Sequence, residues 1–211
     1  MQKLTESEIL EAIKFGEPFS ACHEDGAFEI KLEEYCPHIG TAIHAGHTLR
    51  QDLLDNCLLD DSARLLEEDP FTDSFVSDFP ITLVGRDSRY EYDLNRGPDS
   101  AVYDTAWGVE VWRQPLTDAQ RKLSLAKHAR FYRVMRALAD QLEQRFGGAL
   151  IVDTHSYNYR VREHAAPPVF NIGTEQVDEK RWRSVLEVFD SQLPRMKLPG
   201  IESTLGWNAE F

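Results

Sequence analysis

Two histidines occur where a predicted β-strand gives way to a loop. His44 lies at the end of the strand predicted over 40–45, and His155 follows the strand predicted over 149–152. In open α/β sheets, ligands bind in the loops beyond the carboxyl ends of the strands. A neutral imidazole is a good zinc ligand, and a carboxylate commonly completes a three-ligand catalytic site that leaves one position for water. Because these positions are far apart in the sequence, only the fold can bring the histidines together.

The placement of these histidines leaves their role open. One histidine at a strand end is more often structural than a ligand, whereas two of them beside small residues favour a metal site as much as a structural role. Asp153 precedes His155 and is a candidate to orient its imidazole. His47, three positions after His44, is either a ligand or a surface residue. The remaining histidines are expected to be structural or exposed: His23, His38, His128 and His164.

Two polar segments are candidates to complete a site. The acidic run 67–69 lies close to a predicted strand-to-loop boundary and could supply a carboxylate, although its composition is more typical of a solvated helix end. The segment 87–96 contains Arg89 and Arg96, and a guanidinium offers a planar fork that binds a carboxylate at two points. The alternative for this segment is an exposed strand and turn with salt bridges.

Several catalytic patterns are absent from the sequence. It contains neither a glycine-rich phosphate loop nor a GxSxG motif. Ser156 follows His155, but no second histidine is placed to act as its base, which disfavours a serine hydrolase.

Composition and charge limit the partners of the chain. Among its 211 residues, 36 acidic and 23 basic side chains give a formal net charge of −13, which disfavours nonspecific nucleic-acid binding. No apolar run reaches the ~18 residues of a membrane helix, and the N-terminal segment lacks a signal-peptide core. Three cysteines without a CxxC pair predict free thiols in a reducing compartment. We therefore expect a cytoplasmic protein without nucleic-acid or membrane partners.

The predicted elements place both histidines in one α/β fold. The best-defined helix starts near Thr117, which forms a capping box with Gln120, and stops at 147–148. Strands alternating with helices predict a single domain over 1–211, a three-layer sandwich with helices on both faces of a mixed, mostly parallel sheet. The other predicted elements are strands over 27–32, 40–45, 81–84, 149–152 and 168–172, a weaker strand over 90–94, and helices over 5–15, 51–66 and 180–189.

Five motifs follow one another in a fixed order. They are His44-Ala45-Gly46, Asp69-Pro70, Ser88-Arg89 with Asp93-Leu94-Asn95-Arg96, a long helix with His128 near its middle, and His155-Ser156. In this order they resemble the N-formylglutamate amidohydrolase family, within the wider group of zinc-dependent, carboxypeptidase-like amidohydrolases. The resemblance extends from about His44 to Thr174, since 170–174 is also similar to the family, and it implies a phosphorylase/hydrolase-like fold.

The resemblance implies a zinc site. Its ligands would be His44, Asp69 and His155, with Glu68 or His47 as substitutes for Asp69 because the match in this segment is loose. Zinc in such a site lowers the pKa of a bound water, which is the nucleophile, and polarises the scissile carbonyl.

The resemblance also implies a substrate. Asn95 and Arg96 look like the pair that holds a substrate carboxylate, and Arg89 looks like a second anion contact or a carbonyl polariser. The implied reaction is hydrolysis of a small N-acyl amino acid, in the family's type case N-formylglutamate to formate and glutamate. Arginine would stabilise the developing oxyanion.

One departure from the family concerns the C-terminal end. Family members continue past the equivalent of Phe211 into a strand with a glutamate that resembles the general base of zinc carboxypeptidases. The resemblance therefore implies a shortened domain without this base, whose contribution is typically ~10²–10⁴-fold. The alternative function is then a non-catalytic metal- and carboxylate-binding module. A missing strand would also expose a sheet edge and promote homo-oligomers. A third alternative is an acidic structural protein with incidental histidines.

Overall fold

The computed structural model of this protein describes residues 1–157 and 167–209. The chain forms two compact units, Met1–Tyr157 and Asn158–Phe211. The first unit contains a six-stranded sheet with its helices, and the second contains a two-stranded sheet and one α-helix among its described residues. The single domain expected over 1–211 stays a prediction. His164 lies outside the described residues.

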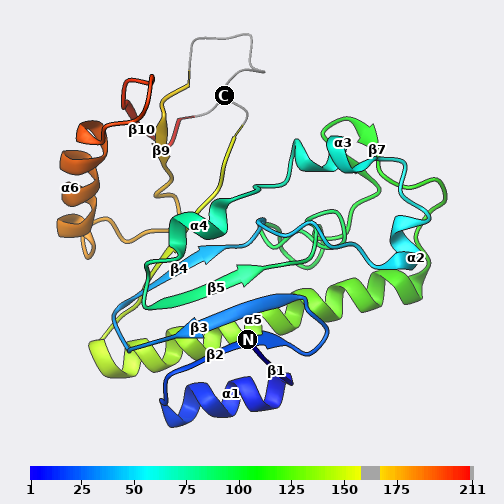
Figure 1. Cartoon of the computed structure of the whole chain (residues 1–211), viewed down its shortest axis with the longest axis horizontal. Helices are drawn as coiled ribbons and strands as arrows, with labels where there is room; N and C mark the ends of the chain where they lie inside the picture. Colours follow the sequence, from blue (N-terminus) through cyan, green and yellow to red (C-terminus); the bar gives the residue numbers. More distant parts are fainter. Residues whose placement is uncertain (158–166, 210–211) are drawn as a thin grey trace. The chain divides into compact units, whose positions relative to one another are not determined.

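The large sheet is mixed, as the alternation of strands and helices predicts (Figure 1). Its order is β1-β2-β3-β5-β4-β8. The pairs β1–β2, β4–β5 and β4–β8 are parallel, whereas β2–β3 and β3–β5 are antiparallel. The strands are β1 (Gln2–Leu4), β2 (Phe19–His23), β3 (Phe28–Leu32), β4 (His38–Ala42), β5 (Ile81–Gly85) and β8 (Leu150–Asp153). Of these, β1 and β2 are not predicted from the sequence.

Strands β4 and β8 bring the two histidines to one edge of the sheet. They are parallel neighbours, and Thr41 lies opposite Asp153. The chain leaves both strands at their carboxyl ends, so His44 and His155 follow at the same edge, as predicted. His44 itself lies in a turn just beyond β4, so the strand is shorter than the predicted 40–45.

Two helices cover one face of the sheet, α1 (Glu6–Phe15) and α5 (Asp118–Phe146). The predicted capping box of Thr117 and Gln120 begins α5. The helix ends at Gly147, whose φ of 75° is accessible to glycine at little cost. Apolar α5 side chains at helical spacing join the main core: Phe131, Val134, Leu138 and Leu142.

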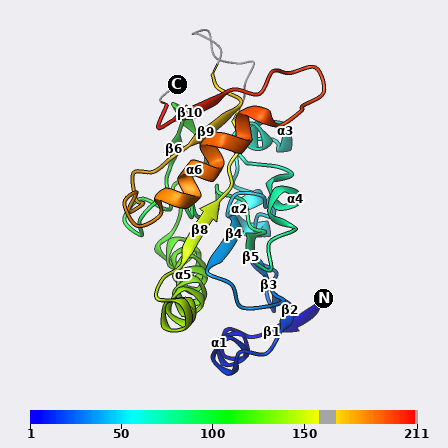
Figure 2. The same ribbon diagram turned by 90° about the vertical axis from the view of Figure 1, so that its left-hand side faces the viewer.

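The opposite face is covered by α4 (Thr72–Val76). Its Val76 packs with Ala42 of β4 and Val84 of β5. Strands β4 and β5 therefore lie between α4 and α5 (Figure 2). Helices on both faces of the sheet agree with the layers predicted from the sequence.

The prediction of one continuous helix over 51–66 is wrong. The segment forms two short helices, α2 (Gln51–Leu54) and α3 (Asp61–Leu65). Between them, Cys57 pairs in an isolated β-bridge with Trp112. Pairing with a distant segment thus overrides the local helical pattern.

The weak strand predicted over 90–94 is also wrong, because this segment forms turns. The backbone N–H of Glu91 donates to the carbonyl of Ser88, and that of Asp93 donates to the carbonyl of Ala101. These hydrogen bonds take the place of pairing with a neighbouring strand. Each polar side chain of the segment therefore points in its own direction.

Shorter elements complete the fold. A hairpin in the first unit, absent from the sequence prediction, joins β6 (Thr105–Ala106) to β7 (Val109–Glu110). The second unit contains β9 (Phe170–Ile172), α6 (Arg183–Gln192), a 3-10 helix (Leu193–Arg195) and β10 (Leu205–Trp207). Strand β9 and helix α6 confirm the elements predicted near 168–172 and 180–189. Within the described residues, no helix has the length and apolar character needed to span a membrane.

Close packing of backbone at the end of β5 gives a first prediction. A Cβ on Gly85 would lie 2.3 Å from the carbonyl oxygen of Ile43, which directly precedes His44. We expect Gly85→Ala to lower the free energy of unfolding by roughly 1–3 kcal/mol, the usual cost of overpacking. Gly97→Ala is the matched control, because nothing lies within 4 Å of its added Cβ, and should stay within about 0.5 kcal/mol. Urea unfolding monitored by circular dichroism measures both, and equal midpoints would contradict the close approach.

Candidate metal centre

The structure brings His44, Asp69 and His155 together. Oδ2 of Asp69 lies 3.3 Å from Nδ1 of His44 and 2.9 Å from Nδ1 of His155. One ligand atom from each of the three side chains lies within 4.8 Å of the others. These are the three residues that the family resemblance implies as zinc ligands.

Asp69 is fixed from the loops after β4 and β8. Its backbone N–H donates to the carbonyl of His44 at 3.0 Å. Its Oδ1 accepts hydrogen bonds from the backbone N–H and the hydroxyl of Ser156, at 3.1 and 3.0 Å. Burial alone raises the pKa of Asp69, but the hydrogen bond from His155 and the nearby imidazole of His44 hold this pKa well below its usual value. The carboxylate is therefore ionised and oriented before any ligand binds.

The outer nitrogens of both imidazoles also face carboxylates. Nε2 of His44 lies 2.8 Å from Oδ1 of Asp93, and Nε2 of His155 lies 2.9 Å from Oδ2 of Asp153. Thr41 donates its hydroxyl proton to the other oxygen of Asp153 at 2.6 Å. A metal-ligating histidine usually donates its other ring N–H to such a partner. Asp153 was predicted for this position, whereas Asp93 was not.

The residues present fit a divalent metal ion. Nδ1 of His44 is buried and has no hydrogen-bond partner within the described part of the chain. An unsatisfied buried nitrogen costs about 1–3 kcal/mol, and a metal ion would remove this cost. Two imidazole nitrogens and one carboxylate oxygen also form a donor set that suits zinc.

The charge of His155 sets a condition for metal binding. Burial lowers the pKa of this imidazole, but the hydrogen bonds to Asp153 and Asp69 outweigh burial and raise the pKa to about 10. Both ring nitrogens thus carry protons at neutral pH in the metal-free protein. A metal ion can bind Nδ1 only after this nitrogen has lost its proton.

The two substitute ligands implied by the resemblance, Glu68 and His47, lie outside this cluster. Glu68 is buried, and its two oxygens accept hydrogen bonds from Nδ1 of His47 and from the hydroxyl of Ser88. Arg64 donates to Nε2 of His47 at 3.0 Å. These contacts direct Glu68 and His47 toward each other.

Two predicted arginines share Asp93 with His44. Oδ2 of Asp93 accepts a hydrogen bond from Arg89 at 2.9 Å and lies 3.3 Å from Nε of Arg96. Arg89 also donates to the carbonyl of Glu67 at 2.7 Å, while its Nε is buried without a partner among the described residues. Asp93 is buried, and although burial raises its pKa, His44 and Arg89 hold the pKa well below its usual value.

Each guanidinium is also stacked on an aromatic ring. The central carbon of Arg89 lies 4.7 Å from the ring centre of Trp107, and that of Arg96 lies 4.9 Å from Tyr103. The predicted residue Asn95 is exposed beside Arg96. Trp107 thus forms part of the surroundings of Arg89.

The motifs and the geometry agree with a comparison against known families. The family model described as N-formylglutamate amidohydrolase matches residues 36–198. This chain belongs to the N-formylglutamate amidohydrolase family. The match contains the three clustered side chains and the predicted substrate-binding residues, so the resemblance inferred from the motifs is confirmed.

Solved structures show the same fold. The crystal structure of the N-formylglutamate amidohydrolase from Ralstonia eutropha is similar with a TM-score of 0.70 and 15% identity, over 86% of this chain and 76% of that chain. A gene product of Agrobacterium tumefaciens is similar with a TM-score of 0.64 and 20% identity, over 86% of this chain and 73% of that chain. A search of curated proteins gave no match.

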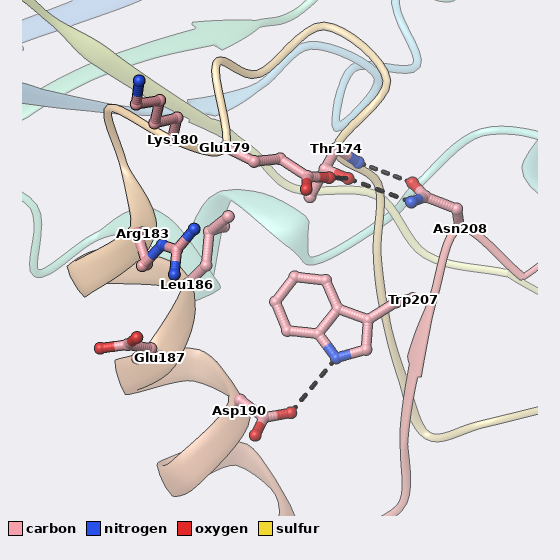
Figure 3. Close-up of a pocket in the computed structure, with 9 residues that line it drawn as sticks. All are labelled: Thr174, Glu179, Lys180, Arg183, Leu186, Glu187, Asp190, Trp207 and Asn208. Carbon is pink, nitrogen blue, oxygen red and sulfur yellow. Dashed lines mark hydrogen bonds between the residues drawn. The ribbon is translucent and has the colours of Figure 1, made fainter.

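A separate pocket of about 720 Å³ lies in the second unit (Figure 3). It lies between α6 and the end of β10, where the indole N–H of Trp207 points to Asp190 at 3.4 Å. Thr174, the last residue of the similar segment 170–174, contributes to its wall and donates its hydroxyl proton to Glu179 at 2.6 Å. None of the predicted metal or substrate residues lines this pocket.

Proposed function

We propose that this chain hydrolyses the amide bond of a small N-acyl amino acid such as N-formylglutamate, with zinc as its metal. The observation that carries this proposal is the convergence of His44, Asp69 and His155 around an unsatisfied buried nitrogen, in a chain of this family. Zinc, when bound, supplies a Lewis acid that polarises the carbonyl and lowers the pKa of a water nucleophile.

The residues around the three ligands act by orienting them. Asp93 and Asp153 each hold one imidazole through Nε2, which leaves Nδ1 for the metal. Ser156 holds the carboxylate of Asp69 with two hydrogen bonds. These contacts orient the three metal-binding side chains before the ion binds. Less reorganisation of these side chains is therefore needed when it does.

Arg96 and Asn95 are assigned to the substrate carboxylate. The side chain of Arg96 is 42% exposed, and its two terminal nitrogens have no hydrogen-bond partner among the described residues. A guanidinium with two such nitrogens can bind a carboxylate at both oxygens. Asn95, exposed next to it, can add an amide N–H.

Arg89 is assigned to the reacting carbonyl. Two of its nitrogens are occupied by Asp93 and the carbonyl of Glu67, which fix the guanidinium. Its Nε–H is buried and has no partner among the described residues. A preorganised donor of this kind stabilises negative charge that develops on an oxygen in the transition state.

Three broader parts of the proposal rest on the sequence and on the family resemblance. They are a zinc carboxypeptidase-like fold, a single domain over 1–211 and a cytoplasmic location. The three cysteines are free thiols, which supports a reducing compartment: Cys22, Cys36 and Cys57. The homo-oligomers expected from the sequence can be tested by analytical ultracentrifugation of the purified chain.

The direct test is formate release from N-formyl-L-glutamate by the zinc-loaded chain. We expect Arg96→Ala to raise KM by about 10- to 100-fold with a smaller change in kcat, because a hydrogen bond to a charged group contributes about 1.5–3 kcal/mol. Arg136→Ala is a control, since Arg136 is an exposed residue of α5.

The outcomes of this test separate the candidate functions. Zinc and substrate binding without formate release would identify a non-catalytic binding module instead. A folded chain that binds no zinc would contradict the proposal. An unchanged KM in Arg96→Ala would show that Arg96 does not bind the substrate carboxylate, but it would not contradict the hydrolase assignment.

A further inference from the structure

The residues assigned to the substrate carboxylate lie on one tight turn. The backbone N–H of Arg96 donates to the carbonyl of Asp93 at 3.1 Å, which closes the turn. The backbone N–H of Asn95 donates to Oδ1 of Asp93 at 2.9 Å. The turn is thus built around Asp93, and the side chains of Asn95 and Arg96 are exposed on it.

Two side chains of α5 hold this turn by its backbone carbonyls. Nε2 of His128 donates to the carbonyl of Arg96 at 2.9 Å. The hydroxyl of Tyr132 donates to the carbonyl of Leu94. His128 and Tyr132 are four positions apart and therefore lie on the same face of the helix. We call this pair the carbonyl clamp, and the two carbonyls that it holds flank Asn95.

The two residues of the carbonyl clamp also support each other. Their ring centres are 4.9 Å apart, and Tyr92 lies edge-on to His128 at 6.5 Å. His128 is 3% exposed, and its hydrogen bond to the carbonyl of Arg96 is part-buried. Helix α5, which carries both residues, is anchored in the main core by Phe131. The clamp therefore connects the turn to α5, whose apolar side chains belong to the main core.

The carbonyl clamp determines how freely Arg96 can move. With its backbone carbonyl held by His128, its Nε near Asp93 and its guanidinium stacked on Tyr103, Arg96 is restrained at three points. The terminal nitrogens are the part left for an anion. A binding group that is held in its bound orientation loses less conformational entropy when the ligand arrives.

We propose that His128 and Tyr132 are positioning residues, which hold the 93–96 turn so that Arg96 and Asn95 meet the substrate carboxylate. This inference rests on the proposed function, in which Arg96 binds that carboxylate. In this arrangement the substrate carboxylate meets Arg96 and Asn95, and His128 and Tyr132 act on substrate affinity through Arg96.

The test compares three variants of the zinc-loaded full chain with N-formyl-L-glutamate as substrate. His128→Leu removes the donor and Tyr132→Phe removes only the hydroxyl, whereas His128→Gln keeps an N–H donor. We expect His128→Leu to raise KM by about tenfold with kcat within about twofold, because one intramolecular hydrogen bond contributes about 0.5–1.5 kcal/mol. Tyr132→Phe should raise KM by about threefold, and His128→Gln should restore part of the affinity.

The controls distinguish the clamp from general damage. Zinc content and the urea midpoint report the integrity of the fold, and Arg136→Ala, exposed on the same helix, should match wild type. Unchanged KM values in His128→Leu and Tyr132→Phe, with a raised KM in Arg96→Ala, would overturn the clamp alone. A fall in kcat at constant KM would also overturn it.

A chain that does not hydrolyse the substrate still permits the test. The same variants are then compared by the calorimetric Kd of N-formyl-L-glutamate, because an inactive protein leaves this ligand intact. Weaker binding in His128→Leu and Arg96→Ala supports the clamp although the hydrolase assignment has failed. Equal affinity in wild type and His128→Leu overturns the clamp, and a wild type that binds no N-formyl-L-glutamate overturns both proposals.

Discussion

Replacing His44 by alanine should abolish stoichiometric zinc binding, from about one ion per chain in wild type. His44 supplies the buried Nδ1 that has no hydrogen-bond partner among the described residues, and its Nε2 is held by Asp93. Loss of a supporting partner behind a ligand typically costs ~10–100-fold in metal affinity, and loss of the ligand itself should cost more. Elemental analysis after dialysis measures the zinc content, and competition with a chromogenic chelator measures the affinity.

The matched control for this prediction is His47→Ala. His47 is also close to an acidic side chain, but its Nδ1 faces Glu68, outside the cluster of His44, Asp69 and His155. We expect His47→Ala to retain wild-type zinc content. Retention of zinc by His44→Ala together with its loss from His47→Ala would show that the ligand set is wrong. A folded wild type without zinc would reject the metal centre itself.

The largest effect on stability is expected at Lys127, in the middle of α5. Its ammonium lies 3.0 Å from Asp87 and 2.9 Å from Glu91, and all three side chains are at least nine-tenths buried. Lys127→Met would leave two buried carboxylates with one fewer cation, since Arg50 pairs with Glu91 but not with Asp87. Removing one partner of a buried ion pair typically costs about 3–5 kcal/mol, so the urea midpoint of the metal-free protein should fall sharply.

An exposed pair on the same helix provides the comparison. Arg133 forms an ion pair with Glu6 across α5 and α1, and more than half of the Arg133 side chain is exposed. Arg133→Ala should cost at most about 1 kcal/mol, because solvent screens exposed pairs. Equal losses in Lys127→Met and Arg133→Ala would mean that the buried cluster contributes no more to stability than a surface pair.

The parts of the site that lie at strand ends could be predicted from the sequence. A histidine at or just after the end of a short predicted strand occurs twice, and the two strands are the parallel neighbours β4 and β8. Helix α5 was equally visible, because the capping box of Thr117, regular apolar spacing and the terminal glycines all indicate the same element. In both cases a repeating pattern over several residues carries the information.

The residues that act from turns could not be assigned in the same way. Asp93 lies in the segment predicted as a weak strand, and its role depends on its two oxygens facing His44 and Arg89. Glu68 and Asp69 are adjacent acidic residues, and only the turn between α3 and α4 decides which one faces the histidines. Side-chain directions in irregular backbone depend on distant contacts, for which local spacing provides no signal.

The positions of His128 and Tyr132 on α5 also determine which changes in chain length the protein can tolerate. Between 124 and 138, one helix face contacts the buried ion cluster, the 93–96 turn and the apolar core. One inserted residue turns every following side chain by about 100° around the helix axis. Insertions and deletions within 124–138 should therefore be far more harmful than most single substitutions there, whereas length changes after Leu142, the last buried residue of α5, leave these three contacts in register.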